Sequence, residues 1–84
     1  MPHDRLLLMS DRLANRLKEE RARLALTQAD LADRIGVSRK TINTIENGVF
    51  IPSTLLALKL ALALDRRVED VFWLEPRPEA SARS

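Results

Sequence analysis

Apolar residues recur at helical spacing on both sides of a glycine near the middle of the chain. Leu31 and Ile35 precede Gly36, and Ile42 and Ile45 follow it. These intervals give each segment one apolar face, which is typical of a short amphipathic helix. Glycine is the residue expected where a helix ends in the left-handed conformation and the chain turns sharply. The pattern therefore predicts two short helices joined by a tight turn.

Capping residues set the limits of these two helices. Thr27 and Asp30 form a box-like start for the first helix, and Ser38 is an N-cap for the second. Gly48 is positioned to end the second helix. We therefore expect a helix-turn-helix over residues 28–47.

The second helix carries polar side chains away from its apolar face, namely Arg39, Lys40, Thr41, Asn43 and Thr44. In the major groove of DNA, Arg and Lys pair with guanine, Asn pairs with adenine, and the Thr methyl group contacts that of thymine. We predict that these five side chains read base edges. The alternative is a solvated polar face on a small helical bundle.

Four residues near the helix ends are candidates for phosphate contacts. Gln28 and Ser38 stand at helix N-termini, where backbone N–H groups favour anions. Asn47 and Gly48 follow the second helix, in a loop expected to offer backbone donors. Phosphate contacts position a protein on DNA, whereas base contacts specify its site.

The chain resembles the Cro/CI-type (XRE, phage repressor-like) helix-turn-helix transcriptional regulators. The matching motifs are Thr27-Gln28, Leu31-Ala32, Ile35-Gly36-Val37-Ser38, Thr41-Ile42 and Ile45-Glu46-Asn47-Gly48. The resemblance extends weakly from about residue 10 to residue 72. It implies an all-α fold, a compact five-helix lambda repressor-like DNA-binding domain.

A first helix is predicted from an N-cap at Ser10 to about Leu24, with Leu13 and Leu17 on its apolar face. Ala25 follows this helix, at a position where the family often has glycine. A left-handed alanine costs roughly 1 kcal/mol or more. The sequence therefore favours a different turn at this point.

Arg21 lies on the apolar face of the first helix, and Glu46 lies on the apolar side of the second helix of the helix-turn-helix. An unpaired buried charge is expensive, so we expect a partly buried Arg21–Glu46 ion pair. An Arg/Glu pair at these positions is common in the resembled family. The alternative is that both side chains extend to water.

A fourth helix is predicted from an N-cap at Ser53 to about Leu64. Its leucines form two stripes, Leu55-Leu58-Leu62 and Leu56-Leu60-Leu64. A helix that is apolar on two sides is buried on two sides, and so small a domain has a core on only one of them. An exposed apolar face marks an interface, so we assign Leu56 and Leu60 to a homodimer contact.

A short fifth helix is predicted over residues 68–72, after a turn at Asp65, a residue type that tolerates left-handed geometry. Trp73 either completes the core or belongs to a short β-type segment at residues 72–75. In the second case the segment pairs with its twin across a two-fold axis. We therefore add Trp73 and Leu74 to the dimer interface.

The domain division follows from these elements. We expect an N-terminal extension over residues 1–9 and the DNA-binding domain over residues 10–75. Residues 76–84 contain no large apolar side chain and are predicted to form a disordered tail.

Composition limits the remaining possibilities. The 84 residues include no cysteine and one histidine, so we expect no disulfide, metal or cofactor. A net charge of +2 is modest for a nucleic-acid binder. The apolar run Leu6-Leu7-Leu8-Met9 is too short for a signal peptide or a membrane span, so we predict a cytoplasmic protein without membrane contact.

The sequence predicts a double-stranded DNA-binding transcriptional regulator, specifically a repressor that binds an inverted-repeat operator as a homodimer. The alternative is an antitoxin or adaptor of the same fold whose main partner is another protein. The chain shows no nucleophile–base arrangement, so an enzyme is not expected. No small-molecule ligand is expected either.

Overall fold

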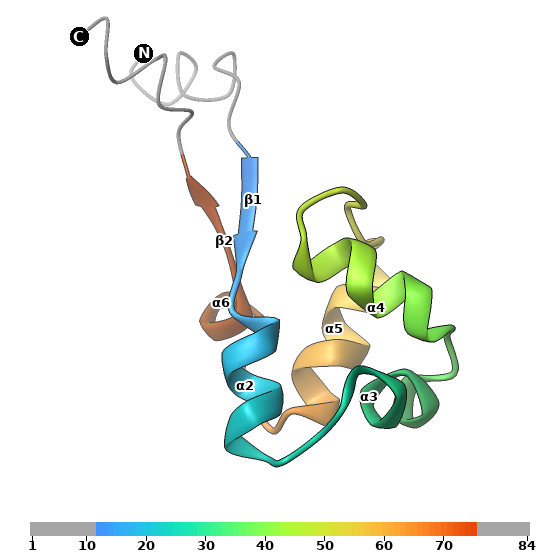
Figure 1. The fold of residues 1–84 in the computed structure, drawn as a ribbon. Helices are drawn as coiled ribbons and strands as arrows, with labels where there is room; N and C mark the ends of the chain where they lie inside the picture. The colour runs from blue at the N-terminus through green and yellow to red at the C-terminus, as the bar shows by residue number, and fades with distance from the viewer. Residues whose placement is uncertain (1–11, 76–84) are drawn as a thin grey trace, which may run out of the picture.

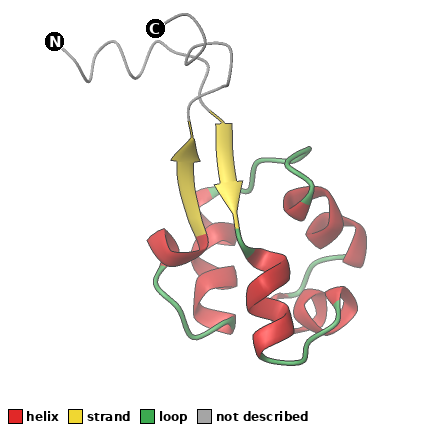
Figure 2. Ribbon diagram, turned by 60° about the vertical axis from the view of Figure 1, so that its left-hand side comes forward, coloured by secondary structure: helices red, strands yellow, loops and turns green. Residues whose placement is uncertain are grey.

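The computed structural model describes residues 12–75. The predictions for the N-terminal extension, the Ser10 cap and the C-terminal tail lie outside these residues. The elements in chain order are β1 (Arg12–Asn15), α2 (Leu17–Arg23), α3 (Gln28–Ile35), α4 (Arg39–Glu46), α5 (Thr54–Ala63), α6 (Val68–Val71) and β2 (Phe72–Glu75). The helices pack into one body, and the two strands extend from it side by side (Figure 1, Figure 2).

Capping side chains begin α3, α4 and α5, as the sequence predicted. The Thr27 hydroxyl accepts a hydrogen bond from the Asp30 N–H, and the Asp30 carboxylate accepts one from the Thr27 N–H, both at 2.9 Å. Hydrogen bonding of the Asp30 carboxylate by the Thr27 backbone, and next by the Thr27 side chain, holds the pKa of Asp30 below its ordinary value. Ser38 and Ser53 each accept a hydrogen bond at 3.1 Å from the backbone N–H three residues on.

Left-handed residues follow these helices. Gly36 ends α3 at a φ of 75°, and Gly48 follows α4 at a φ of 74°, as expected for glycine at a helix end. Asp65 follows α5 at a φ of 56°, which agrees with its tolerance of this conformation.

The prediction of a different turn after α2 is wrong, because Ala25 is also left-handed, with a φ of 56°. Two hydrogen bonds hold it there. The Leu26 N–H donates to the Arg21 carbonyl at 2.8 Å, and the Ala25 N–H donates to the Ala22 carbonyl at 3.1 Å. This is the Schellman pattern that normally contains glycine, so the bonds of the turn offset the strain in Ala25.

The first helix is shorter than predicted, because residues Arg12–Asn15 form β1 and α2 begins at Leu17. The Asn15 side chain ends the strand by accepting a hydrogen bond at 3.0 Å from the Leu17 N–H. The backbone of β1 finds its partner in β2, far away in the sequence. The domain is therefore mostly helical with a two-stranded sheet, and all-α is only an approximate description.

The β-type segment predicted at residues 72–75 is present as β2, but it pairs within the chain. It lies antiparallel to β1, with Leu13 opposite Leu74 and Ala14 opposite Trp73. The Arg16 N–H continues the pairing by donating to the Val71 carbonyl at 3.0 Å. This antiparallel sheet within one chain replaces the predicted pairing with a twin strand across a two-fold axis. The fifth helix, α6, ends at Val71, one residue earlier than predicted.

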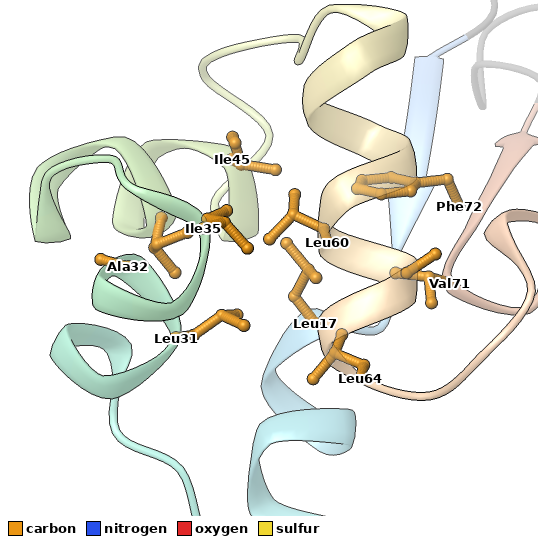
Figure 3. Close-up of a cluster of buried hydrophobic side chains, with 11 residues drawn as sticks. Leu17, Leu31, Ala32, Ile35, Ile45, Leu60, Leu64, Val71 and Phe72 are labelled. Carbon is orange, nitrogen blue, oxygen red and sulfur yellow. The ribbon is translucent and has the colours of Figure 1, made fainter.

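The core lies where the helices meet (Figure 3). Every helix contributes to it, and the side chains with no more than 1% of their surface exposed are Leu17, Leu31, Ile42, Ile45, Leu60, Leu64 and Val71. Phe72 at the start of β2 is also buried and joins the sheet to this core.

The two leucine stripes of α5 are divided differently from the prediction. Leu60 is fully buried, so its assignment to a dimer interface is wrong. Leu56 is half-buried and packs against the core, and its place in a dimer interface stays a prediction. The exposed stripe is the other one, with Leu55, Leu58 and Leu62 exposed by 68%, 51% and 81%. None of the helices between residues 12 and 75 is long and apolar enough to cross a bilayer.

Candidate nucleic-acid interface

The outer surface of α4 carries the side chains that the sequence predicted to read bases. Ile42 and Ile45 anchor the helix in the core, so its polar side is turned outward. Three of the five candidates are exposed, namely Arg39, Lys40 and Asn43. The other two, Thr41 and Thr44, are half-buried. One helix face therefore presents two cations, an amide and two small hydroxyl side chains.

The hydroxyl groups of this face are engaged locally. The Thr44 hydroxyl donates to the Thr41 carbonyl at 3.0 Å, and the hydroxyls of Thr41 and Ser38 lie 3.0 Å apart. Because the hydroxyl groups are engaged in these contacts, we expect Thr41 and Thr44 to contact a base through their methyl groups. In the major groove, a Thr methyl group makes apolar contact with the methyl group of thymine.

The expected Arg21–Glu46 ion pair is present and attaches α4 to α2. Arg21 Nε lies 2.5 Å from Glu46 Oε2, and Arg21 Nη2 donates to Glu46 Oε1 at 3.1 Å. Only 14% of the Arg21 side chain and 7% of the Glu46 side chain are exposed. Arg21 also donates to the Leu26 carbonyl at 3.0 Å. The pair is bidentate and largely buried, so it fixes the C-terminal end of α4.

Gln28 belongs to this network, which changes its predicted phosphate role. Its Nε2 donates to Glu46 Oε1 at 3.1 Å, so the side chain is turned toward Glu46. The backbone N–H of Gln28 lies in the first turn of α3, where N–H groups have no partner within the helix. We therefore expect the backbone N–H of Gln28, rather than its side chain, to contact a phosphate.

Asn47 and Gly48 do not offer the backbone donors that the sequence predicted. The Asn47 N–H donates to the Asn43 carbonyl at 3.1 Å, and the Gly48 N–H donates to the Ile45 carbonyl at 3.0 Å. Closure of the α4 C-terminus uses both groups. Asn47 retains its side-chain amide, which donates to Asn43 Oδ1 at 3.3 Å on the surface.

Sequence reasoning missed two further polar anchors. Asn15 Nδ2 donates at 3.0 Å to the Ile45 carbonyl, so β1 holds the end of α4. Glu20 is 7% exposed and receives hydrogen bonds from Arg66 at 3.0 Å and Arg23 at 2.8 Å. The bond from Arg66, followed by that from Arg23, lowers the pKa of Glu20 despite its burial. The Glu20–Arg23 pair is local, three residues apart on α2, but no local pattern pairs Asn15 with Ile45 or Glu20 with Arg66.

The helix-turn-helix family model matches residues 17–71, which include α2 to α6. The chain belongs to the Cro/CI-type helix-turn-helix family of transcriptional regulators. Members of this family bind DNA. The polar surface of α4 therefore belongs to the second helix of the helix-turn-helix that defines this family.

Two relatives are similar to most of this chain. The HTH-type transcriptional regulator YgzD of Bacillus subtilis (strain 168) is 48% identical over 63 residues, which cover 75% of this chain and 96% of that protein. A regulator of Methanothermobacter thermautotrophicus is 47% identical over 60 residues, covering 70% of this chain and 87% of its own.

A solved structure shares the fold. The restriction-modification controller protein C.AhdI from Aeromonas hydrophila is 35% identical and superposes with a TM-score of 0.61. The match covers 64% of this chain and 78% of that chain.

Proposed function

We propose that this regulator is a sequence-specific repressor that binds an inverted-repeat operator in double-stranded DNA as a homodimer. The observation that carries the proposal is the polar face of α4, held outward by its buried isoleucines and by the Arg21–Glu46 pair. A rigidly held helix of this kind fits the major groove, where base edges are distinguishable.

The roles of the individual residues follow from their positions. Arg39 and Lys40 stand exposed in the first turn of α4 and read guanine, and Asn43 reads adenine further along. Thr41 and Thr44 supply methyl contacts. Ser38, the Gln28 backbone and the Asn47 side chain contact phosphates at the edges of the site, where such contacts set the register.

The homodimer accounts for the apolar face of α5. Leu55, Leu58 and Leu62 form a stripe on the surface of a small domain, and a second copy buries that stripe against its own. Trp73 and Leu74, exposed by 36% and 61%, are further candidates for the contact. A two-fold pair places the reading helices about 34 Å apart, one turn of DNA, which requires an inverted-repeat operator.

A second candidate function rests on the same leucine stripe. In an antitoxin or adaptor, the exposed face of α5 binds a different protein instead of a second copy. Light scattering on the purified protein distinguishes the two, because a stable homodimer already covers this face.

Selection of bound sequences from a random pool of double-stranded DNA tests the proposal directly. We expect enrichment of an inverted repeat whose half-sites lie about one helical turn apart. A pool that shows no enrichment after repeated rounds contradicts specific DNA binding. A reporter gene placed behind the selected site then tests repression, because expression should fall when the protein is supplied.

A further inference from the structure

An open hollow of about 350 Å³ lies against α4, next to the candidate base-reading residues. It is formed by one side of α4 and by the loop that follows the helix. The lining residues are Ser38, Lys40, Thr41, Thr44, Val49 and Phe50. Three of these six are candidate base-reading residues, so the hollow is continuous with the proposed DNA surface.

Two large apolar side chains form the loop side of this hollow. Val49 is 77% exposed and Phe50 is 47% exposed. The loop is nevertheless held in place, because the Val49 and Phe50 N–H groups both donate to the Thr44 carbonyl, at 2.9 and 3.1 Å. Apolar side chains fixed at the rim of a polar binding surface mark a contact site.

The major groove offers one kind of apolar group to such a site. Base edges there carry hydrogen-bond donors and acceptors, and the exception is the 5-methyl group of thymine. A methylated cytosine carries the same group at the same ring position. The lining of the hollow matches this chemistry, because Thr41 and Thr44 carry methyl groups and Val49 and Phe50 are apolar. Lys40 also lines the hollow, where it is available to a neighbouring guanine.

We propose that Val49 and Phe50 are specificity-determining residues that, with Thr41 and Thr44, receive the 5-methyl group of a pyrimidine in the operator. The inference rests on the proposed function, because the methyl group reaches the hollow only when α4 lies in the major groove. It adds two loop residues to the five α4 residues that read bases.

The test uses the full chain and the selected operator, with each thymine of a half-site replaced in turn by uracil, which lacks only the methyl group. At one position we expect the affinity of the wild-type protein to fall about fourfold, the effect of exposing one buried methyl group. The variant V49A/F50A should bind the uracil and thymine operators equally. If the methyl group that the hollow receives belongs to 5-methylcytosine, methylating one cytosine of the operator should strengthen wild-type binding about fourfold. The same methylation should have no effect on binding by V49A/F50A.

Ile51→Ala is the matched control, because Ile51 is 71% exposed in the same loop but does not line the hollow. It should keep the wild-type response to the methyl group. If V49A/F50A is unstable in a thermal melt, the single variant Val49→Ala replaces it, since that side chain is mostly outside the fold.

Three outcomes overturn the inference. In the first, no methyl group affects wild-type binding. In the second, the variant responds to the methyl group as the wild type does. In the third, light scattering shows that the variant has become a monomer, so that the loop belongs to the subunit interface. A wild-type protein that selects no DNA at all contradicts the proposed function instead.

Discussion

Glu46 is the residue at which three segments of the domain meet. Its carboxylate accepts hydrogen bonds from Arg21 and Gln28, and Arg21 also holds the Leu26 carbonyl. Glu46→Ala leaves the Arg21 guanidinium almost buried and without its carboxylate. We expect the free energy of unfolding to fall by about 2–4 kcal/mol, because an unpaired buried charge costs much more than the pair contributes.

Urea denaturation of Glu46→Ala measures this loss, and Glu69→Ala is the control. Glu69 also pairs with an arginine, Arg67, but its side chain is 59% exposed, so water replaces the lost partner. A Glu46→Ala protein that is no less stable than Glu69→Ala would show that the Arg21–Glu46 pair does not hold the fold together.

Ala25 is a strained residue that glycine should relieve. Its φ of 56° places its Cβ in the conformation that disfavours L-residues. We expect Ala25→Gly to raise the free energy of unfolding by about 0.5–1 kcal/mol, after the extra flexibility of glycine in the unfolded chain is subtracted. The melting temperature should rise by a few degrees.

Ala22→Gly, within the preceding helix α2, should lower the stability instead. Ala22 is exposed within α2, where glycine costs roughly 1 kcal/mol relative to alanine. If both substitutions lower the melting temperature, the turn after α2 does not strain Ala25.

Among the elements, α4 is the one whose function is most directly testable. Arg39→Ala and Lys40→Ala each remove an exposed cation from its first turn without touching the core. We expect each to relax the preference at particular base pairs by about 1–3 kcal/mol, the value of a good bidentate contact. Repeating the selection with each variant measures this change.

The exposed Lys18→Ala on α2 serves as the control and should leave the selected consensus unchanged. An Arg39→Ala protein that selects the wild-type consensus with uniformly weaker binding would assign Arg39 to a phosphate instead.

The elements also show what the sequence could and could not predict. The starts of α3, α4 and α5 were predictable because Thr27, Ser38 and Ser53 act on backbone groups three residues away. β1 was not, because its partner is β2, at the other end of the domain. The four-residue interval from Leu13 to Leu17 also fits a helix, so the local pattern favoured the wrong element.

The same limit applies to α5 and to the candidate site. Six leucines gave two equivalent stripes, and only packing against the other helices decides that Leu60 is buried and Leu62 is exposed. On α4 the polar surface was predictable from helical spacing. The Gln28 side chain donates to Glu46, a tertiary contact that the local sequence does not predict. The backbone N–H groups of Asn47 and Gly48 donate to α4 carbonyls, so the prediction that they are free for phosphates was wrong.

For the whole molecule, the modest net charge and the apolar stripe of α5 both support the proposed homodimer. A net charge of +2 is modest for a nucleic-acid binder, and we expect one subunit with one reading helix to contact few phosphates, release few counterions and bind weakly. Joining two subunits makes binding to the second half-site intramolecular, which raises affinity by about 100-fold or more. The stripe of Leu55, Leu58 and Leu62 offers the surface for that joining.

Leu62→Glu is the sharpest test of this dimer, because Leu62 is 81% exposed and its replacement leaves the core intact. A pair of carboxylates at a two-fold contact repel each other and resist burial, so we expect a folded monomer whose affinity for the palindrome falls to that for a half-site. Ala22→Glu makes the same charge change on the exposed side of α2 and should remain a dimer with nearly wild-type affinity. Light scattering and DNA titrations on the two variants compare them directly. A wild-type protein that is monomeric at micromolar concentration, and binds one half-site as tightly as the palindrome, would refute the dimer.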